Sequence, residues 1–198
     1  MFFNVEQLIL SFGYASLFLI LFAETGLLVG FFLPGDTLLF TAGLLASKNI
    51  IGLGETIAVC ALAAVVGDSF GYFLGKRFGK RVFEKEGHFL DDYLNKKNLE
   101  RTKRFFEKHG GKTIFFARWI PVVRTIAPTF AGTGEMSYLS FLFYNVLGGV
   151  SWVLSVTLAG YFLGSLIPNL VEYVSIAILL VVVISFVPVL VRLARGKR

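Results

Sequence analysis

The sequence predicts an all-α polytopic membrane protein that forms a single domain over residues 1–198. Its composition is the first reason: hydrophobic residues make up 56% of the chain, whereas an ordinary soluble domain has about 45–50%. The second reason is that several apolar stretches approach the roughly 20 residues that a spanning helix needs. Charge distribution is the third, because 12 of the 19 basic residues lie within Lys76–Lys112, between apolar stretches.

Four apolar stretches are predicted to be spanning helices. The first begins near Val5, and the last two come from one long apolar region that Pro168 and Asn169 divide. The predicted spans are Leu8–Phe22, Thr56–Gly75, Tyr138–Ile167 and Tyr173–Leu193.

Two further apolar stretches, Gly26–Ala46 and Thr113–Gly132, are poor straight helices. Proline interrupts each near its middle, at Pro34-Gly35 and at Pro121. Each also holds or adjoins charged residues, and a charge at the centre of a bilayer costs at least about 3 kcal/mol. Such charges are retained where they face a cavity, a partner or a polar path, so these stretches indicate a functional site.

The positions of the basic segments predict the topology of the broken stretches. The loop at about 76–112 and the tail at about 192–198 are both basic, which favours the cytoplasmic side for both. The two spans between Tyr138 and Leu193 already return the chain to that side. Thr113–Gly132 must then enter and leave by one face, as a re-entrant hairpin with Pro121 at its tip.

The same reasoning makes Gly26–Ala46 a second re-entrant hairpin, opening to the outside, with Pro34 and Gly35 at its tip. The two hairpins then enter from opposite faces, and both chain termini are expected in the cytoplasm. Transporters often place their site near the midplane, where two such broken elements meet. We therefore expect one polar site between the hairpins.

Arg118 and Arg124 are the candidate substrate-binding residues. They are six residues apart on either side of Pro121, so a straight helix would not present both on one face. A turn at Pro121 could direct both to one cavity, where guanidinium groups would bind phosphate through paired donors. The alternative is that they neutralise Glu24 or Asp36, or extend to the membrane interface, and ion pairing and ligand binding are compatible.

Glu24, Asp36 and Asp68 are the candidate residues for proton or ion coupling. A carboxylate removed from water can carry a proton near neutral pH, and apolar residues surround Glu24. Asp36 follows Pro34-Gly35 and could instead cap a helix N-terminus. Asp68 lies well inside the predicted span Thr56–Gly75, where it is either a third coupling acid or the partner of an arginine.

Other motifs indicate packing or nothing specific. Gly67, Gly71, Gly75 and Gly79 recur every four residues, a spacing that lets helices approach closely. HGGKT at 109–113 lacks the first glycine of a phosphate-binding loop. We find no catalytic nucleophile, no metal-binding pattern and no cofactor motif, and we expect neither an enzyme nor a nucleic-acid-binding protein.

Taken together, several motifs resemble the DedA family, bacterial relatives of the VTT-domain (SNARE-associated Golgi) proteins. They are Glu24, FLPGD at 32–36, GDxxGYxxGKxxG at 67–79, FFARWIPVVRT at 115–125 and AGTGEM at 131–136. The resemblance covers about residues 24–161. It implies an inner-membrane protein with two facing re-entrant hairpins, and matches the family's important acids to Glu24 and Asp36 and its essential arginines to Arg118 and Arg124.

The predicted function is lipid transport across the bacterial cytoplasmic membrane. The resemblance implies undecaprenyl phosphate or a glycerophospholipid as cargo and dependence on a proton or sodium gradient. The alternatives are a membrane scaffold that assists envelope assembly or cell division, and a small-ion channel or antiporter. A homo-oligomer is a further option, and the sequence carries no signal on the oligomeric state.

Overall fold

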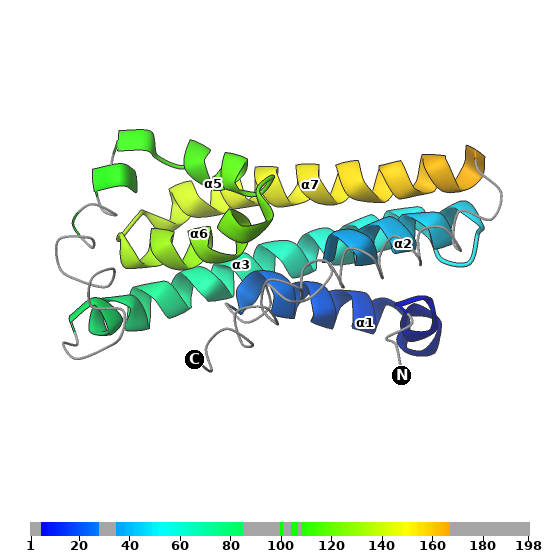
Figure 1. The fold of residues 1–198 in the computed structure, drawn as a ribbon, viewed down its shortest axis with the longest axis horizontal. Helices are drawn as coiled ribbons and strands as arrows, with labels where there is room; N and C mark the ends of the chain where they lie inside the picture. The colour runs from blue at the N-terminus through cyan, green and yellow to red at the C-terminus, as the bar shows by residue number, and fades with distance from the viewer. Residues whose placement is uncertain (1–4, 28–34, 85–99, 101–103, 107, 167–198) are drawn as a thin grey trace, which may run out of the picture.

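The computed structural model describes residues 5–27, 35–84, 100, 104–106 and 108–166, and every regular element in those residues is an α-helix (Figure 1). The helices lie along one long axis, with α3 (Leu53–Glu84) and α7 (Tyr138–Leu166) as the longest. The all-α prediction is therefore confirmed for this part of the chain. The predicted span Tyr173–Leu193 and the tail at 192–198 lie outside the described residues, as does much of the basic loop.

Helices α3 and α7 are the two described helices long and apolar enough to cross a membrane, over Leu53–Gly79 and Tyr138–Leu166. At 1.5 Å per residue, each exceeds the roughly 30 Å of a hydrocarbon core. They run antiparallel, because the Tyr138 hydroxyl donates to the Ser69 hydroxyl and the Asn145 amide donates to the Val65 carbonyl. Both were predicted as spans: Thr56–Gly75 was shorter than the observed α3, and Tyr138–Ile167 agrees with α7 to within one residue.

Helix α1 (Val5–Gly26) differs from the straight span predicted at Leu8–Phe22, because it kinks at Gly13. Gly13 has φ +57° and ψ −143°, a conformation that glycine adopts readily because it has no Cβ. Figure 1 shows the first turns, in dark blue, lying at an angle to the rest of α1. From Tyr14 to Gly26 the helix is about 20 Å long, which is too short to cross a bilayer alone.

The part of α1 after the kink and helix α2 (Gly35–Ser47) form an antiparallel pair, which we call the acidic helix pair. Tyr14 lies beside Gly52 and Gly26 beside Gly67, so α1 runs in the direction of α3. Helix α2 runs in the direction of α7, since Gly43 lies against Thr157 and Leu44 against Gly164. The first helix of this pair is thus the end of α1, whereas the sequence predicted that the hairpin would begin at Gly26.

Helices α5 (Lys112–Ala117) and α6 (Pro121–Thr133) form the second antiparallel pair, the basic helix pair. Phe115 lies against Gly148 of α7, and α5 runs in the direction of α7. Helix α6 runs in the direction of α3, because Gly75 lies against Thr129 and Gly79 against Thr133. The chain therefore reverses between Arg118 and Pro121, where the sequence predicted a turn.

The glycines at four-residue intervals on α3 pack against neighbouring helices, as predicted. A Cβ at Gly75 would lie 1.9 Å from the Thr129 carbonyl oxygen, and one at Gly67 would lie 2.1 Å from the Thr25 hydroxyl. These contacts seat α6 and the end of α1 directly on α3. The same device joins α2 to α7, where a Cβ at Gly43 would lie 2.1 Å from the Thr157 carbonyl oxygen.

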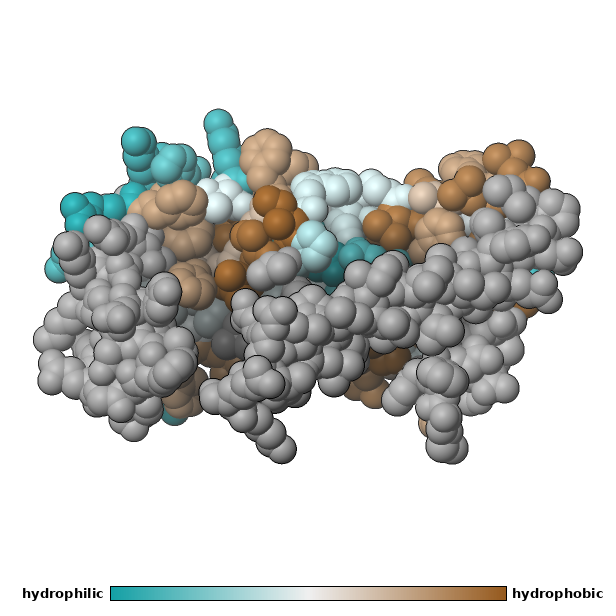
Figure 2. Space-filling view, viewed as in Figure 1, coloured by the Kyte–Doolittle hydropathy of each residue, from teal (hydrophilic) through white to brown (hydrophobic). Residues whose placement is uncertain are grey.

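Two apolar clusters form the core of the described residues, and a polar layer that includes Asp68 of α3 and Asn145 of α7 separates them. One cluster includes Ala64 of α3 and Trp152 of α7, and the other includes Tyr72 and Phe141 of the same two helices. Figure 2 shows hydrophilic residues gathered at the end of the molecule where α5 begins, while apolar residues extend toward the far end of α7. The long helices thus place a polar layer near mid-length, well inside an apolar surface.

Candidate functional site

All five charged residues that the sequence singled out lie in this polar layer. Arg124 donates from Nη2 to Glu24 Oε1 at 2.6 Å and from Nη1 to Asp36 Oδ1 at 2.8 Å. Arg118 forms an ion pair through Nη1 with Asp68 Oδ2. The basic helix pair thus contacts the acidic helix pair through Arg124 and α3 through Arg118.

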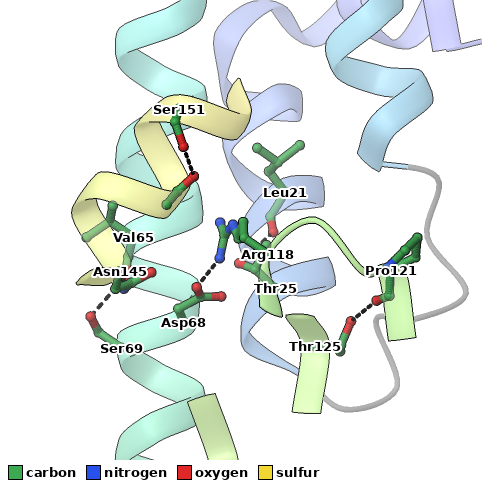
Figure 3. Close-up of polar contacts among 11 residues, drawn as sticks. Leu21, Thr25, Val65, Asp68, Ser69, Arg118, Pro121, Thr125, Asn145 and Ser151 are labelled. Carbon is green, nitrogen blue, oxygen red and sulfur yellow. Dashed lines mark hydrogen bonds and ion pairs between the residues drawn. The ribbon is translucent and has the colours of Figure 1, made fainter. Parts of the chain in front are cut away.

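The break between α5 and α6 is what directs both arginines to the same layer. Pro121 is the first residue of α6, and its missing N–H costs nothing at that position. Ile120 before it is extended, with φ −112° and ψ 108°, as the residue preceding proline prefers. Figure 3 shows Arg118 reaching from this turn to Asp68 on α3. Of the predicted tip residues, Pro121 and Gly35 begin helices, whereas Pro34 lies outside the described residues.

Four of the five charged residues are almost completely buried, since Glu24, Asp68, Arg118 and Arg124 expose 8% or less of their surface. Asp36 differs, because half of its side chain is exposed. Burial strengthens an ion pair but leaves any unpaired charge costly. The charges of the polar layer therefore depend on one another for neutralisation, and Asp36 of α2 is the most exposed of them.

Trp152 of α7 is a member of the site that the sequence did not predict. Its ring centroid lies 5.0 Å from Cζ of Arg118 and 4.6 Å from Cζ of Arg124. Its indole Nε1 donates to Asp36 Oδ1 at 2.9 Å. A buried indole N–H requires an acceptor, so a tryptophan inside a predicted span was a signal for a polar partner nearby. The sequence did not show which residue that partner is.

Several polar atoms in the layer have no hydrogen-bond partner among the described residues. Some of these atoms are hydrogen-bond acceptors and others are donors. The acceptors are Glu24 Oε2, Asp68 Oδ1 and Asn145 Oδ1, and the donors are Arg118 Nε and Nη2. Buried polar atoms in proteins almost always have a partner. The layer thus holds both buried acceptors and buried donors that no described residue satisfies.

The described residues hold no group of three His, Cys, Asp or Glu side chains that could bind a metal ion. His109 is exposed, and its Nδ1 lies 3.1 Å from the Phe105 carbonyl oxygen. The acids of the polar layer are instead committed to arginines. We therefore assign no metal site to the described part of the chain.

Comparison with known proteins agrees with the motifs. Residues 33–162 match the VTT domain family. The chain is 44% identical over 98% of its length to Protein DedA of Escherichia coli, of which it covers 90%. It is 42% identical over 92% of its length to an uncharacterized membrane protein of Mycobacterium tuberculosis, of which it covers 79%.

A third relative is the inner membrane protein YqjA of Escherichia coli, which is 38% identical over 76% of the chain, covering 67% of YqjA. No solved structure matches the chain.

Proposed function

The chain belongs to the VTT-domain family of DedA membrane proteins, and from this premise we propose that it moves a phosphate-headed lipid across the bacterial cytoplasmic membrane. One relative carries the name inner membrane protein, which supports this location. The proposal names a transporter rather than an enzyme, with undecaprenyl phosphate or a glycerophospholipid as the class of cargo.

The observation that carries the proposal is the pair of buried arginines at the turn of the basic helix pair. Guanidinium groups remain charged in any environment and bind phosphate through two parallel hydrogen bonds. Arg118 and Arg124 expose 3% and 8% of their surface and share one aromatic neighbour, Trp152. Buried cations at mid-length would attract a lipid headgroup away from the membrane surface.

We propose that the two helix pairs are re-entrant and enter the membrane from opposite faces. The helices of each pair are too short to span a bilayer, since α2 and α6 have 13 residues each. In each pair the second helix runs back toward the face at which the first helix begins. The positive-inside rule would place the end with Lys112 and Lys76 in the cytoplasm. Residues 28–34, at the proposed tip of the acidic pair, lie outside the described part of the chain.

This arrangement changes the expected side of the N-terminus. Tyr14 accepts a hydrogen bond from the backbone N–H of Gly52, at the end of α3 opposite to Lys76. Because the kink at Gly13 leaves no straight first span, the residues before it would lie on the outer side. The cytoplasmic C-terminal tail and its preceding span stay predictions from the sequence.

The excess of carboxylates over arginines supports coupling to a proton or a sodium ion. Glu24, Asp36 and Asp68 face only two guanidiniums, and a buried charge without a partner is costly. Uptake of one cation would balance the layer, and entry of a phosphate would require further compensation. A gradient of that cation could therefore drive the headgroup through the layer.

Purified protein in liposomes with a labelled phosphate-headed lipid tests the proposal. Arg118→Ala and Arg124→Ala should each abolish lipid movement, while Arg104→Ala should not. Arg104 is a matched control because its side chain is 70% exposed and its Glu100 contact is 3.9 Å. Movement that survives both buried substitutions would remove the phosphate role, and wild-type protein that moves no lipid under any gradient would favour a scaffold or an ion antiporter.

A further inference from the structure

The two arginines, which the sequence treats alike, are held differently in the structure. Arg124 uses both terminal nitrogens, Nη1 for Asp36 and Nη2 for Glu24. Arg118 uses only Nη1, for Asp68, and its Nε and Nη2 are buried without a partner among the described residues. One guanidinium is therefore occupied by two carboxylates and the other has donors to spare.

The spare donors of Arg118 lie along one edge of the guanidinium plane. Nε–H and the adjacent Nη2–H point in the same direction, and this edge accepts two oxygens of a carboxylate or phosphate in parallel. Cζ of Arg118 lies over the face of the Trp152 ring, 5.0 Å from its centroid. Two buried donors on one cation that lack acceptors are a costly arrangement, and a ligand that supplies the acceptors would remove that cost.

Gly149 of α7 lies beside one of these two donors, Nη2. A Cβ built on Gly149 would sit 3.6 Å from Arg118 Nη2, an ordinary contact distance. Its neighbour Gly148 faces a different part of the same residue, since a Cβ there would lie 3.7 Å from Arg118 Cβ and 3.4 Å from Phe115 Cα. The glycine at position 149 thus keeps a side chain away from Nη2 of Arg118, whereas Gly148 does not face either donor.

We infer that the Nε–Nη2 edge of Arg118, beside Gly149, is the oxyanion-binding subsite, and that Arg124 joins the acidic and basic helix pairs without being the first contact of the ligand. The inference rests on the proposed function and assigns different roles to its two arginines. The ligand is an oxyanion with two coplanar oxygens and a further oxygen for other partners, which describes a phosphate monoester.

The acceptors left over nearby fit the same ligand. Asp68 Oδ1 and Asn145 Oδ1 are buried and have no donor among the described residues. The Asn145 amide donates to the carbonyl of Val65, three residues before Asp68 on α3, and Figure 3 shows Arg118 directed to Asp68. A phosphate monoester that keeps one proton can donate to such an acceptor while two other oxygens accept from Arg118. A fully deprotonated oxyanion would be repelled by the negative charge of Asp68.

Binding can be measured through Trp152, independently of transport. The chain has two tryptophans, so Trp119→Phe leaves Trp152 as the only indole, in contact with both guanidiniums. The full-length protein in dodecyl maltoside is titrated with dodecyl phosphate, with inorganic phosphate and with dodecyl glucoside as a neutral chain of equal length. The change in Trp152 emission reports occupancy in each titration.

Two neighbouring substitutions separate the edge from the rest of the residue. Gly149→Ala places a methyl group against Nη2 without a clash and should weaken dodecyl phosphate binding by at least about tenfold, as expected for the loss of one charge-assisted hydrogen bond. Gly148→Ala adds the same volume one residue away and should change the dissociation constant by less than about twofold. Thermal unfolding and gel filtration of both variants verify that each is folded.

Equal effects of the two alanines would overturn the subsite, even if lipid transport by the wild type stands. Arg118→Lys, which retains the charge without the planar edge, should also weaken binding; full affinity in this variant would contradict the inference. Tenfold preference for dodecyl phosphate over inorganic phosphate supports a lipid headgroup. Equal affinity for the two supports the subsite but contradicts lipid cargo, and a wild type that binds neither overturns both proposals.

Discussion

The acidic and basic helix pairs have the same plan and opposite charge. Each consists of two antiparallel helices that meet near mid-length of α3 and α7, and each contributes two charged residues to the polar layer. They differ in exposure: both arginines of the basic pair are buried, whereas half of Asp36 is exposed. The basic pair thus supplies a fixed charge, and the acidic pair supplies the more accessible side of the contact.

Breaking the contact between the pairs should have the largest effect. Arg124→Ala leaves Glu24 buried without its partner, and removing one member of a buried ion pair costs about 3–5 kcal/mol. Thermal unfolding in detergent should therefore show a large loss for Arg124→Ala and a smaller one for Asp36→Asn, because Asp36 is half exposed. Arg104→Ala, at an exposed pair, should leave the unfolding temperature unchanged. Equal losses for Arg124→Ala and Arg104→Ala would mean that the helix pairs do not meet through this residue.

The glycine contacts test how each pair is seated on its long helix. Gly75→Ala forces a Cβ to within 1.9 Å of the Thr129 carbonyl oxygen, and Gly43→Ala to within 2.1 Å of the Thr157 carbonyl oxygen. Backbone must move in both, which costs about 1–3 kcal/mol. Gly54→Ala is the control, because nothing lies within 4 Å of a Cβ there. A stable Gly75→Ala variant would show that α6 does not rest directly on α3.

Trp152 links the two pairs through α7, and its polar contact can be removed separately from its ring. Trp152→Phe keeps an aromatic face for both guanidiniums but loses the hydrogen bond to Asp36, worth about 1 kcal/mol in stability. We expect reduced lipid transport with a small shift in unfolding temperature, whereas Trp152→Leu should lower both further. If Trp152→Phe and Trp152→Leu behave alike, the cation–π contacts contribute nothing measurable.

The basic pair was easier to predict from sequence than the acidic pair, and the reason is local. Pro121 begins a helix and restricts the residue before it, so the turn is determined by neighbouring residues. In the acidic pair the decisive residue was Gly13, eleven positions before Glu24, and a glycine within an apolar helical pattern does not by itself indicate a kink. The predicted first span therefore extended across the position where the helix bends.

Contacts between residues on different helices were the hardest feature to predict from the sequence. The sequence placed Glu24, Asp36, Asp68, Arg118 and Arg124 in one site because charges in apolar segments are rare. It could not assign partners, and the structure pairs Arg118 with Asp68 and Arg124 with both other acids. Trp152 joins the site only because α2 and α7 run side by side, a contact that no local pattern specifies.

The smallest perturbations test the sidedness of the two pairs. In a Cys60→Ala background, single cysteines at Gly54 and at Ser137 lie at opposite ends of the long helices, and both positions are exposed. A membrane-impermeant thiol reagent added to intact cells should label the Gly54→Cys variant and not the Ser137→Cys variant, without loss of transport in either. An epitope tag before Met1 should then be accessible from the outside, because the kink at Gly13 returns the chain to the Gly52 end of α3. Accessibility only from the cytoplasm would restore the first span that the sequence predicted, and the acidic pair would no longer mirror the basic one.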